Sequence, residues 1–282
     1  MRFGVLGPLI LEDGQEYPLP SAPKTRQLLA LLLLHRNTTV PLEQCLEEIW
    51  GPDSPRSAVQ SLHTRVLHIR QAFACVPPVG SRRRAKELLA TQHRGYRLNV
   101  GPESLDLHAC DAYVSRAQKA QAARDDRQIR SSLRSALALW RGPVLSDVST
   151  GTYLQSHIVG LEEYRLNLLE RCLEAELRLG LHHELLPQLG QLVAEHPTNE
   201  NFHAQYMIAL HRSGRSAQAL DIHRSLHDSL SRELGIAPSP KLGELQTAIL
   251  NSDHILDAPP ADRHGLSLDL CAADTGKGDE FS

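Results

Sequence analysis

Apolar positions in the first hundred residues follow two different periods. Up to residue 20 they alternate around Gly and Pro turn signals, which predicts short antiparallel strands. Two short apolar stretches around His93-Arg94-Gly95 predict a β-hairpin. Between them, apolar residues recur three and four apart, which predicts helices over residues 21–37, 39–51 and 57–73. The predicted order is therefore strands, three helices and a hairpin.

Capping signals place the ends of the first two helices. Ser21 or Pro23 marks the start of the first, whose buried stripe is expected to be Leu28, Leu29, Leu32 and Leu33. Thr39 is the expected N-cap of the second helix, with Pro41 in its first turn and Gly51 at its end.

The third helix has two contrasting faces. At 100° per residue with Ser57 at zero, its apolar positions form one core-facing stripe at about 120° to 200°. These positions are Val59, Leu62, Val66, Ile69 and Phe73. Opposite this stripe, within about 80° of zero, lie seven uncharged polar or basic side chains and no acid. They are Ser57, Gln60, Ser61, Thr64, Arg65, His68 and Gln71. Because an ordinary solvated face mixes both signs of charge, this acid-free face favours DNA reading from the major groove.

Beyond residue 105 the pattern is helical throughout. Apolar or small residues three and four apart predict one helix over residues 109–140 and another ending at Gly180. Similar segments begin at Gly180 and Gly214, and a period of 34 residues is that of tetratricopeptide helix pairs. Residues 105–250 are therefore expected to form an α-solenoid, and the polar composition of residues 251–282 predicts a flexible tail.

Charge is distributed unevenly between the two halves. The chain has 282 residues, is 41% hydrophobic and carries a net charge of −3, which suits two packed domains. Residues 56–97 nevertheless carry nine Lys and Arg against one acid, Glu87. Such a field attracts a polyanion such as DNA, although charge alone leaves a solvated basic surface as an alternative.

Signals for other classes of protein are missing from the sequence. No signal peptide and no apolar run of about 18 residues is present, so a cytoplasmic protein is expected. The five cysteines lie at least 30 residues apart and the histidines form no ligand motif, so no metal and no cofactor is expected. Phosphate-loop, dinucleotide-binding and nucleophile-elbow motifs are absent, which argues against an enzyme.

Several long motifs resemble one bacterial family in the right order. "VLGPLILEDG", "KTRQLLALLLLHRN", "LEEIWGPDSPRSA", "LHTRVLHIRQAF" and "HRGYRLNV" are similar to the OmpR-type winged helix of the Streptomyces antibiotic regulatory protein family. "LWRGPVL" and residues 192–250 resemble its bacterial transcriptional activation domain. The resemblance implies a mainly α protein, with a winged helix-turn-helix over residues 1–100 and tetratricopeptide-like helical repeats over residues 105–250.

The resemblance also implies roles for particular residues. The third helix would enter the major groove, with base-reading candidates Ser57, Gln60, Ser61, Thr64, Arg65 and His68. The hairpin would lay Arg94 along the minor groove, and the candidates for backbone and wing contacts are Lys24, Arg26, Arg56, Arg82, Arg83, Arg84, Arg94 and Tyr96. Here Arg82, Arg83 and Arg84 are expected in a loop before the hairpin. The loop after the second helix would touch RNA polymerase, with Trp50, Asp53 and Ser54 as candidates; Asp53 is the better of these, because the alternative for the Trp50 ring is a place in the core.

Taken with the charge pattern, the resemblance predicts a transcriptional activator. Two protomers would bind promoter direct repeats side by side and recruit RNA polymerase through sigma factor region 4, the alpha C-terminal domain and the beta flap. The regulated genes would belong to a secondary-metabolite, antibiotic pathway. Two alternatives stay open: a repressor or ligand-responsive regulator whose helical domain serves dimerisation or sensing, and a protein-interaction adaptor with a basic front.

Overall fold

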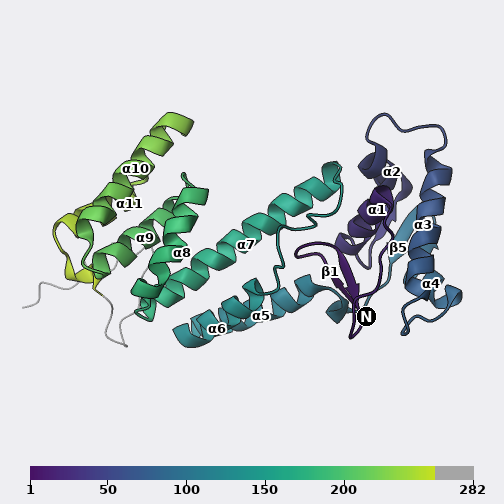
Figure 1. Cartoon of the computed structure of the whole chain (residues 1–282), viewed down its shortest axis with the longest axis horizontal. Coiled ribbons are helices and arrows are strands. Elements are labelled where there is room, and N and C mark those ends of the chain that lie inside the picture. The colour runs from purple at the N-terminus through teal and green to yellow at the C-terminus, as the bar shows by residue number, and fades with distance from the viewer. Residues whose placement is uncertain (258–282) are drawn as a thin grey trace, which may run out of the picture. The chain divides into compact units, whose positions relative to one another are not determined.

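The computed structural model describes residues 1–257 and divides into two compact units (Figure 1). The first unit consists of Met1–Ser115 and Ser135–Leu166, and the second begins with Arg116–Arg134 and resumes at Asn167. The breaks fall inside three helices, α5 (Asp106–Ala122), α6 (Asp126–Leu137) and α7 (Thr152–Arg178). The expected break between residues 100 and 105 therefore coincides with none of these three breaks.

The predicted N-terminal strands and first helix are confirmed. Strands β1 (Arg2–Gly4) and β2 (Ile10–Glu12) pair antiparallel, with Phe3 opposite Leu11. Helix α1 (Pro23–Leu34) is buried continuously from Leu28 to Leu33 rather than along one stripe. It packs against the next two helices and the closing hairpin, so apolar residues on every side of α1 are covered.

The helix-turn-helix and its hairpin occupy residues 39–98. The elements are β3 (Thr39–Pro41), α2 (Leu42–Trp50), α3 (Ala58–Ala74), α4 (Arg82–Leu88), β4 (Leu89–Gln92) and β5 (Gly95–Leu98). The three strands form one antiparallel sheet in the order β3-β5-β4. This is a small winged helix-turn-helix, as predicted.

Two local predictions in this segment are wrong. Thr39 is not an N-cap, because it lies in β3 opposite Arg97, and the N-cap of α2 is Pro41. The stretch expected to be a loop before the hairpin is the helix α4. Its N-cap Ser81 accepts a hydrogen bond from the backbone N–H of Arg84 at 3.3 Å, which satisfies an otherwise free donor at the helix start.

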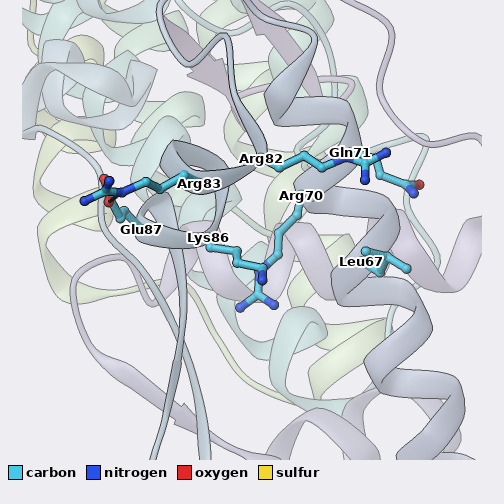
Figure 2. Close-up of a pocket in the computed structure, with 7 residues that line it drawn as sticks. All are labelled: Leu67, Arg70, Gln71, Arg82, Arg83, Lys86 and Glu87. Carbon is cyan, nitrogen blue, oxygen red and sulfur yellow. Dashed lines mark hydrogen bonds and ion pairs between the residues drawn. The ribbon is translucent and has the colours of Figure 1, made fainter.

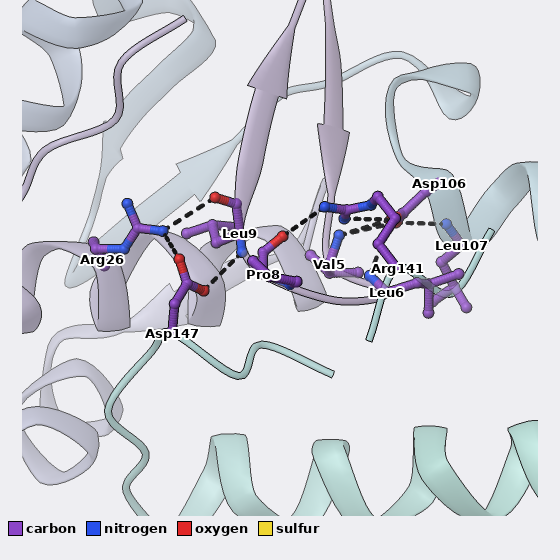
Figure 3. Close-up of polar contacts among 9 residues, drawn as sticks. All are labelled: Val5, Leu6, Pro8, Leu9, Arg26, Asp106, Leu107, Arg141 and Asp147. Carbon is purple, nitrogen blue, oxygen red and sulfur yellow. Dashed lines mark hydrogen bonds and ion pairs between the residues drawn. The ribbon is translucent and has the colours of Figure 1, made fainter. Parts of the chain in front are cut away.

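Polar contacts extend the first unit beyond residue 100 (Figure 3). The Asp106 carboxylate accepts hydrogen bonds from the backbone N–H groups of Val5 and Leu6, each at 2.9 Å. Arg141 donates to the carbonyl of Pro8 at 2.9 Å. Asp147 accepts from the backbone N–H of Leu9 at 2.8 Å and pairs with Arg26 of α1. The bonds from Asp106, Arg141 and Asp147 fix the β1–β2 connection to segments 100 or more residues later.

A buried carboxylate of α2 caps the start of α7. Glu48 is 2% exposed, and its Oε1 accepts from the backbone N–H of Gly151 at 2.6 Å. Its Oε2 accepts from the N–H groups of Tyr153 at 2.9 Å and Leu154 at 3.1 Å. Gln27 of α1 donates to Oε1 at 3.0 Å. A carboxylate is stabilising at a helix N-terminus, because it meets unpaired N–H groups and the positive end of the helix dipole.

The second unit contains the predicted repeat. Helices α8 (His182–Glu195), α9 (Glu200–Arg212), α10 (Ser216–Leu234) and α11 (Pro240–Leu250) follow one another, and α8 and α10 begin 34 residues apart. Gly180 and Gly214 precede them with φ of 80° and 74°, a left-handed geometry that glycine adopts at no steric cost. Apolar residues of α9, α10 and α11 share one core, so the helical-repeat prediction is confirmed.

The helix expected over residues 109–140 is divided in two. Helix α5 ends at Ala122 and α6 begins at Asp126. Arg124 has a left-handed φ of 56°, and Asp125 caps the new helix by accepting from the N–H of Gln128 at 3.0 Å. The prediction of a single helix is therefore wrong.

The prediction of a flexible tail from residue 251 is wrong for residues 251–257. A 3-10 turn, η2 (His254–Leu256), follows α11, and Leu256 is buried in the core of the second unit. Arg212 donates to the carbonyl oxygens of Leu177 at 2.8 Å, Leu256 at 2.7 Å and Asp257 at 3.2 Å. Burial lowers the pKa of Arg212 to about 10. Residues 251–257 are thus held in place, and the rest of the predicted tail, with Cys271, lies outside the described residues.

Within residues 1–257, no helix combines the length and the apolarity that a membrane crossing requires.

Candidate nucleic-acid interface

One side of α3 packs into the core of the first unit. Leu62, Val66, Ile69 and Phe73 are buried as predicted, and the Phe73 ring meets Phe3 edge-on at 5.7 Å between centroids. Val59 was expected beside them and is instead 38% exposed, whereas the small Ala58 is buried. At 100° per residue, the buried arc thus spans about 100° to 180° from Ser57. The predicted core stripe was correct except for Val59.

The opposite side of α3 is an acid-free exposed arc. Its members are Val59, Gln60, His63, Thr64, Leu67, His68 and Gln71. On the same helical wheel, the centre of this arc lies at about 290°, which equals −70°. The exposed face of α3 is therefore turned by about 70° around the helix axis from the face that was expected around Ser57. The Thr64 hydroxyl donates to the carbonyl of Gln60 at 3.1 Å, which leaves its methyl group and an acceptor lone pair free.

The base-reading candidates separate into two groups. Gln60, Thr64 and His68 lie on the exposed arc, and Ser57 is exposed at the N-cap, next to the backbone candidate Arg56. Ser61 and Arg65 are half-buried at the flank, where Arg65 donates to the carbonyl of Ser61 at 3.0 Å. His63 and Leu67 are exposed, but they were not among the candidates named from the sequence. Val59 had been assigned to the core and the DNA-reading face had been centred on Ser57, whereas the observed exposed arc has its centre about 70° away.

Two cations meet the indole of Trp50 at the end of α2. The Arg65 guanidinium lies 5.2 Å from the ring centroid and the Lys24 ammonium 5.0 Å from it. Such contacts stabilise and orient a cation over an aromatic ring. Trp50 is half-buried between helices rather than fully exposed, whereas Asp53 and Ser54 are exposed in the loop between α2 and α3.

A cationic groove of about 650 Å³ runs between α3 and α4 (Figure 2). It is lined by Leu67, Arg70, Gln71, Arg82, Arg83, Lys86 and Glu87. Arg70 is fixed by hydrogen bonds to the carbonyl of Leu89, at 2.7 Å from one terminal nitrogen, and to the Thr91 hydroxyl at 2.9 Å. Arg83 pairs with Glu87 on the exposed side of α4 at 3.2 Å. The groove therefore presents more positive than negative charge beside the exposed arc.

The hairpin presents one of its two predicted contact residues. Arg94 is exposed at the turn with φ of 65°, and its carbonyl accepts from the N–H of Leu42 at 2.8 Å, which fixes the turn to α2. Tyr96 is 3% exposed opposite Val40, so the prediction that it touches DNA is wrong. Arg26, a phosphate-contact candidate at the start of α1, is only partly exposed and pairs with Asp147.

Three comparisons identify the family. Residues 105–250 match the family profile described as the bacterial transcriptional activator domain. The chain is 39% identical over 274 residues to regulatory protein DnrI of Streptomyces peucetius, which covers 97% of this chain and 98% of that protein. It is 37% identical to regulatory protein AfsR of Streptomyces coelicolor over 91% of this chain, but spans only 25% of that longer protein.

A solved structure agrees with these matches. Mycobacterium tuberculosis EmbR, in complex with a low-affinity phosphopeptide, superposes with a TM-score of 0.83 and 30% identity, over 92% of this chain and 66% of that one. The described residues are mainly helical, with two small β-sheets in the first hundred residues, in agreement with the fold class that the sequence predicted. The chain therefore belongs to the Streptomyces antibiotic regulatory protein family of transcriptional regulators.

Proposed function

We propose that this chain is a sequence-specific DNA-binding activator of transcription that works in the cytoplasm without a cofactor and without catalysing a reaction. The observation that carries the proposal is the acid-free exposed arc of α3, beside the cations of α4 and the exposed turn of the hairpin. A major groove about 12 Å wide admits a helix, and Gln, Thr and His side chains reach base edges from there.

The remaining exposed cations suit the DNA backbone. With α3 in the major groove, Arg94 at the hairpin turn lies along the adjacent minor groove. Arg56, Arg82, Arg83 and Arg84 are exposed beside or before α3 and serve phosphates. Residues 1–100 thus supply DNA binding in this proposal, and residues 105–250 supply activation.

Partners of the helical part follow from the family. In our proposal, two protomers bind promoter direct repeats side by side and recruit RNA polymerase through sigma factor region 4, the alpha C-terminal domain and the beta flap. Asp53 and Ser54 are the exposed candidates for a polymerase contact, with Trp50 behind them. The regulated genes would belong to an antibiotic or other secondary-metabolite pathway, in keeping with the Streptomyces relatives named as regulatory proteins.

Transcription from a footprinted promoter with purified RNA polymerase tests the proposal. Full-length protein is expected to raise transcript yield, and a variant with Asp53→Ala and Ser54→Ala is expected to bind the same site while stimulating less. A repressor would lower the yield. An adaptor would leave no footprint, because it has no preferred sequence.

Arg83→Ala is expected to weaken binding to every duplex alike. A lone phosphate contact carries no base information, so site preference stays unchanged. The slope of log affinity against log salt is expected to become shallower by about one unit, as binding-affinity titrations on preferred and scrambled duplexes would measure.

Arg224→Ala is a matched control for this variant. Arg224 is an exposed arginine of α10 that pairs with Asp221 on its own helix, as Arg83 pairs with Glu87. The control is expected to keep the wild-type salt slope. A change of base preference in Arg83→Ala would contradict its assignment to the DNA backbone.

A further inference from the structure

We propose that Leu67 is a specificity-determining residue that recognises the methyl group of thymine in the major groove. This inference rests on the proposed function, and it assigns to the exposed arc a preference for A·T base pairs at the step that Leu67 faces.

Leu67 is the exposed leucine of a helix whose other large apolar side chains are mostly in the core. It is 51% exposed, whereas Leu62, Val66, Ile69 and Phe73 are buried. At 100° per residue it lies about 10° from the centre of the exposed arc, between His63, Thr64 and Gln71 on the turns before and after it. An apolar side chain at the centre of a polar arc contributes binding free energy only when an apolar group covers it.

The positively charged side chains around Leu67 indicate which kind of molecule binds over it. Leu67 lines the groove with Arg70, Arg82, Arg83 and Lys86, and Glu87, the acid of this lining, is paired with Arg83. Figure 2 shows Leu67 on α3 at one side of the groove and Arg83, Lys86 and Glu87 on α4 at the other. The partner must therefore combine an apolar group with strong negative charge. In the DNA major groove the thymine methyl group, flanked by phosphates, has both properties.

Side chains next to Leu67 can contact both bases of an A·T pair. The Thr64 hydroxyl is bonded within its own helix to the Gln60 carbonyl, so its methyl group adds to the apolar surface next to Leu67. Gln60 and Gln71 are exposed on the same arc, and a glutamine amide pairs with the N6 and N7 atoms of adenine. Apolar contact to thymine and amide contact to adenine together favour A·T over G·C.

Replacement of thymine by uracil in the bound site tests the inference. Uracil keeps every hydrogen-bonding group of thymine and lacks only its 5-methyl group. A preferred duplex, enriched by the full chain from a random pool, is resynthesised with each thymine replaced in turn. We expect binding of the wild-type chain to weaken about fourfold at one or two positions, since one methyl group leaves the contact.

Leu67→Ala decides whether Leu67 is the residue responsible. Because the side chain is exposed, the variant is expected to fold, which its circular dichroism spectrum checks. It is expected to bind the thymine duplex more weakly and to lose the difference between thymine and uracil at those positions. Val159→Ala, which removes an exposed apolar side chain from α7, is expected to keep the full difference.

Each outcome bears on a different claim. If the wild-type chain prefers its site but binds thymine and uracil equally at every position, or if Leu67→Ala keeps the discrimination, the inference is wrong and the proposed function stands. If Leu67→Ala loses only an interaction with polymerase or with a second copy of the chain, Leu67 is a protein contact and the inference is also wrong. If no duplex is enriched, the proposed function itself fails.

Discussion

Glu48→Gln is expected to lower the free energy of unfolding of the first unit by about 2 to 4 kcal/mol. The carboxylate accepts from three backbone N–H groups at the start of α7 and from Gln27. Glutamine has one acceptor oxygen instead of two. Its NH₂ group cannot accept a hydrogen bond and would face the backbone N–H donors at the start of α7, so some of these buried donors lose their partner. Replacing the charge also removes a favourable interaction with the helix dipole.

Urea denaturation followed by tryptophan fluorescence measures this effect. Both tryptophans of the chain, Trp50 and Trp140, belong to the first unit, so their emission reports its unfolding. Glu47→Gln is the matched control, because Glu47 is exposed and accepts a single hydrogen bond, from the Tyr153 hydroxyl at 2.7 Å. We expect the control to cost less than about 1 kcal/mol. Equal effects of the two substitutions would show that the capping contact contributes little.

Gln60→Ala is expected to weaken binding to the preferred duplex by about 1 to 3 kcal/mol and to relax the base preference at one or two adjacent positions. The reason is that Gln60 lies exposed near the centre of the arc, where its amide can make paired hydrogen bonds to a base edge. Affinities for the preferred duplex and for its single-base variants would measure both effects.

Arg65→Ala distinguishes the exposed arc from the face expected around Ser57. Arg65 is held at the flank by the Trp50 ring and the carbonyl of Ser61, so its loss is expected to weaken all duplexes without changing base preference. If Arg65→Ala relaxed the preference and Gln60→Ala did not, the reading face would be centred nearer Ser57 than the exposed arc is.

Periodicity alone predicted most of the elements that form this interface. Four buried residues of α3 (Leu62, Val66, Ile69 and Phe73), the hairpin turn at Arg94 and the 34-residue repeat were correctly predicted, because each depends on local spacing or turn chemistry. The rotation of α3 was predicted less well. Val59 fits an apolar stripe as well as Ala58 does, and only the packing of α3 on its neighbours decides which of the two is buried.

Contacts between distant segments were not predictable in the same way. Glu48, Asp106 and Asp147 look like solvated charges in the sequence, yet each accepts hydrogen bonds from backbone groups about 100 or more residues away. Thr39 carries an N-cap signal, but β5 offers it a strand partner. The arginine run of α4 has no apolar period, and Ala85 is its buried residue. For Glu48, Asp106, Asp147 and Thr39 the deciding partner is remote in the chain.

A competition between a preferred and a scrambled duplex, titrated with salt, tests the central claim that the exposed arc of α3 reads DNA sequence. Full-length protein is expected to prefer the duplex enriched from a random pool by a factor of about 10³ or more at physiological salt. Gln60→Ala and Leu67→Ala are expected to reduce that factor, whereas Arg83→Ala is expected to preserve it. Equal affinity of the wild-type chain for both duplexes at every salt concentration would contradict the claim.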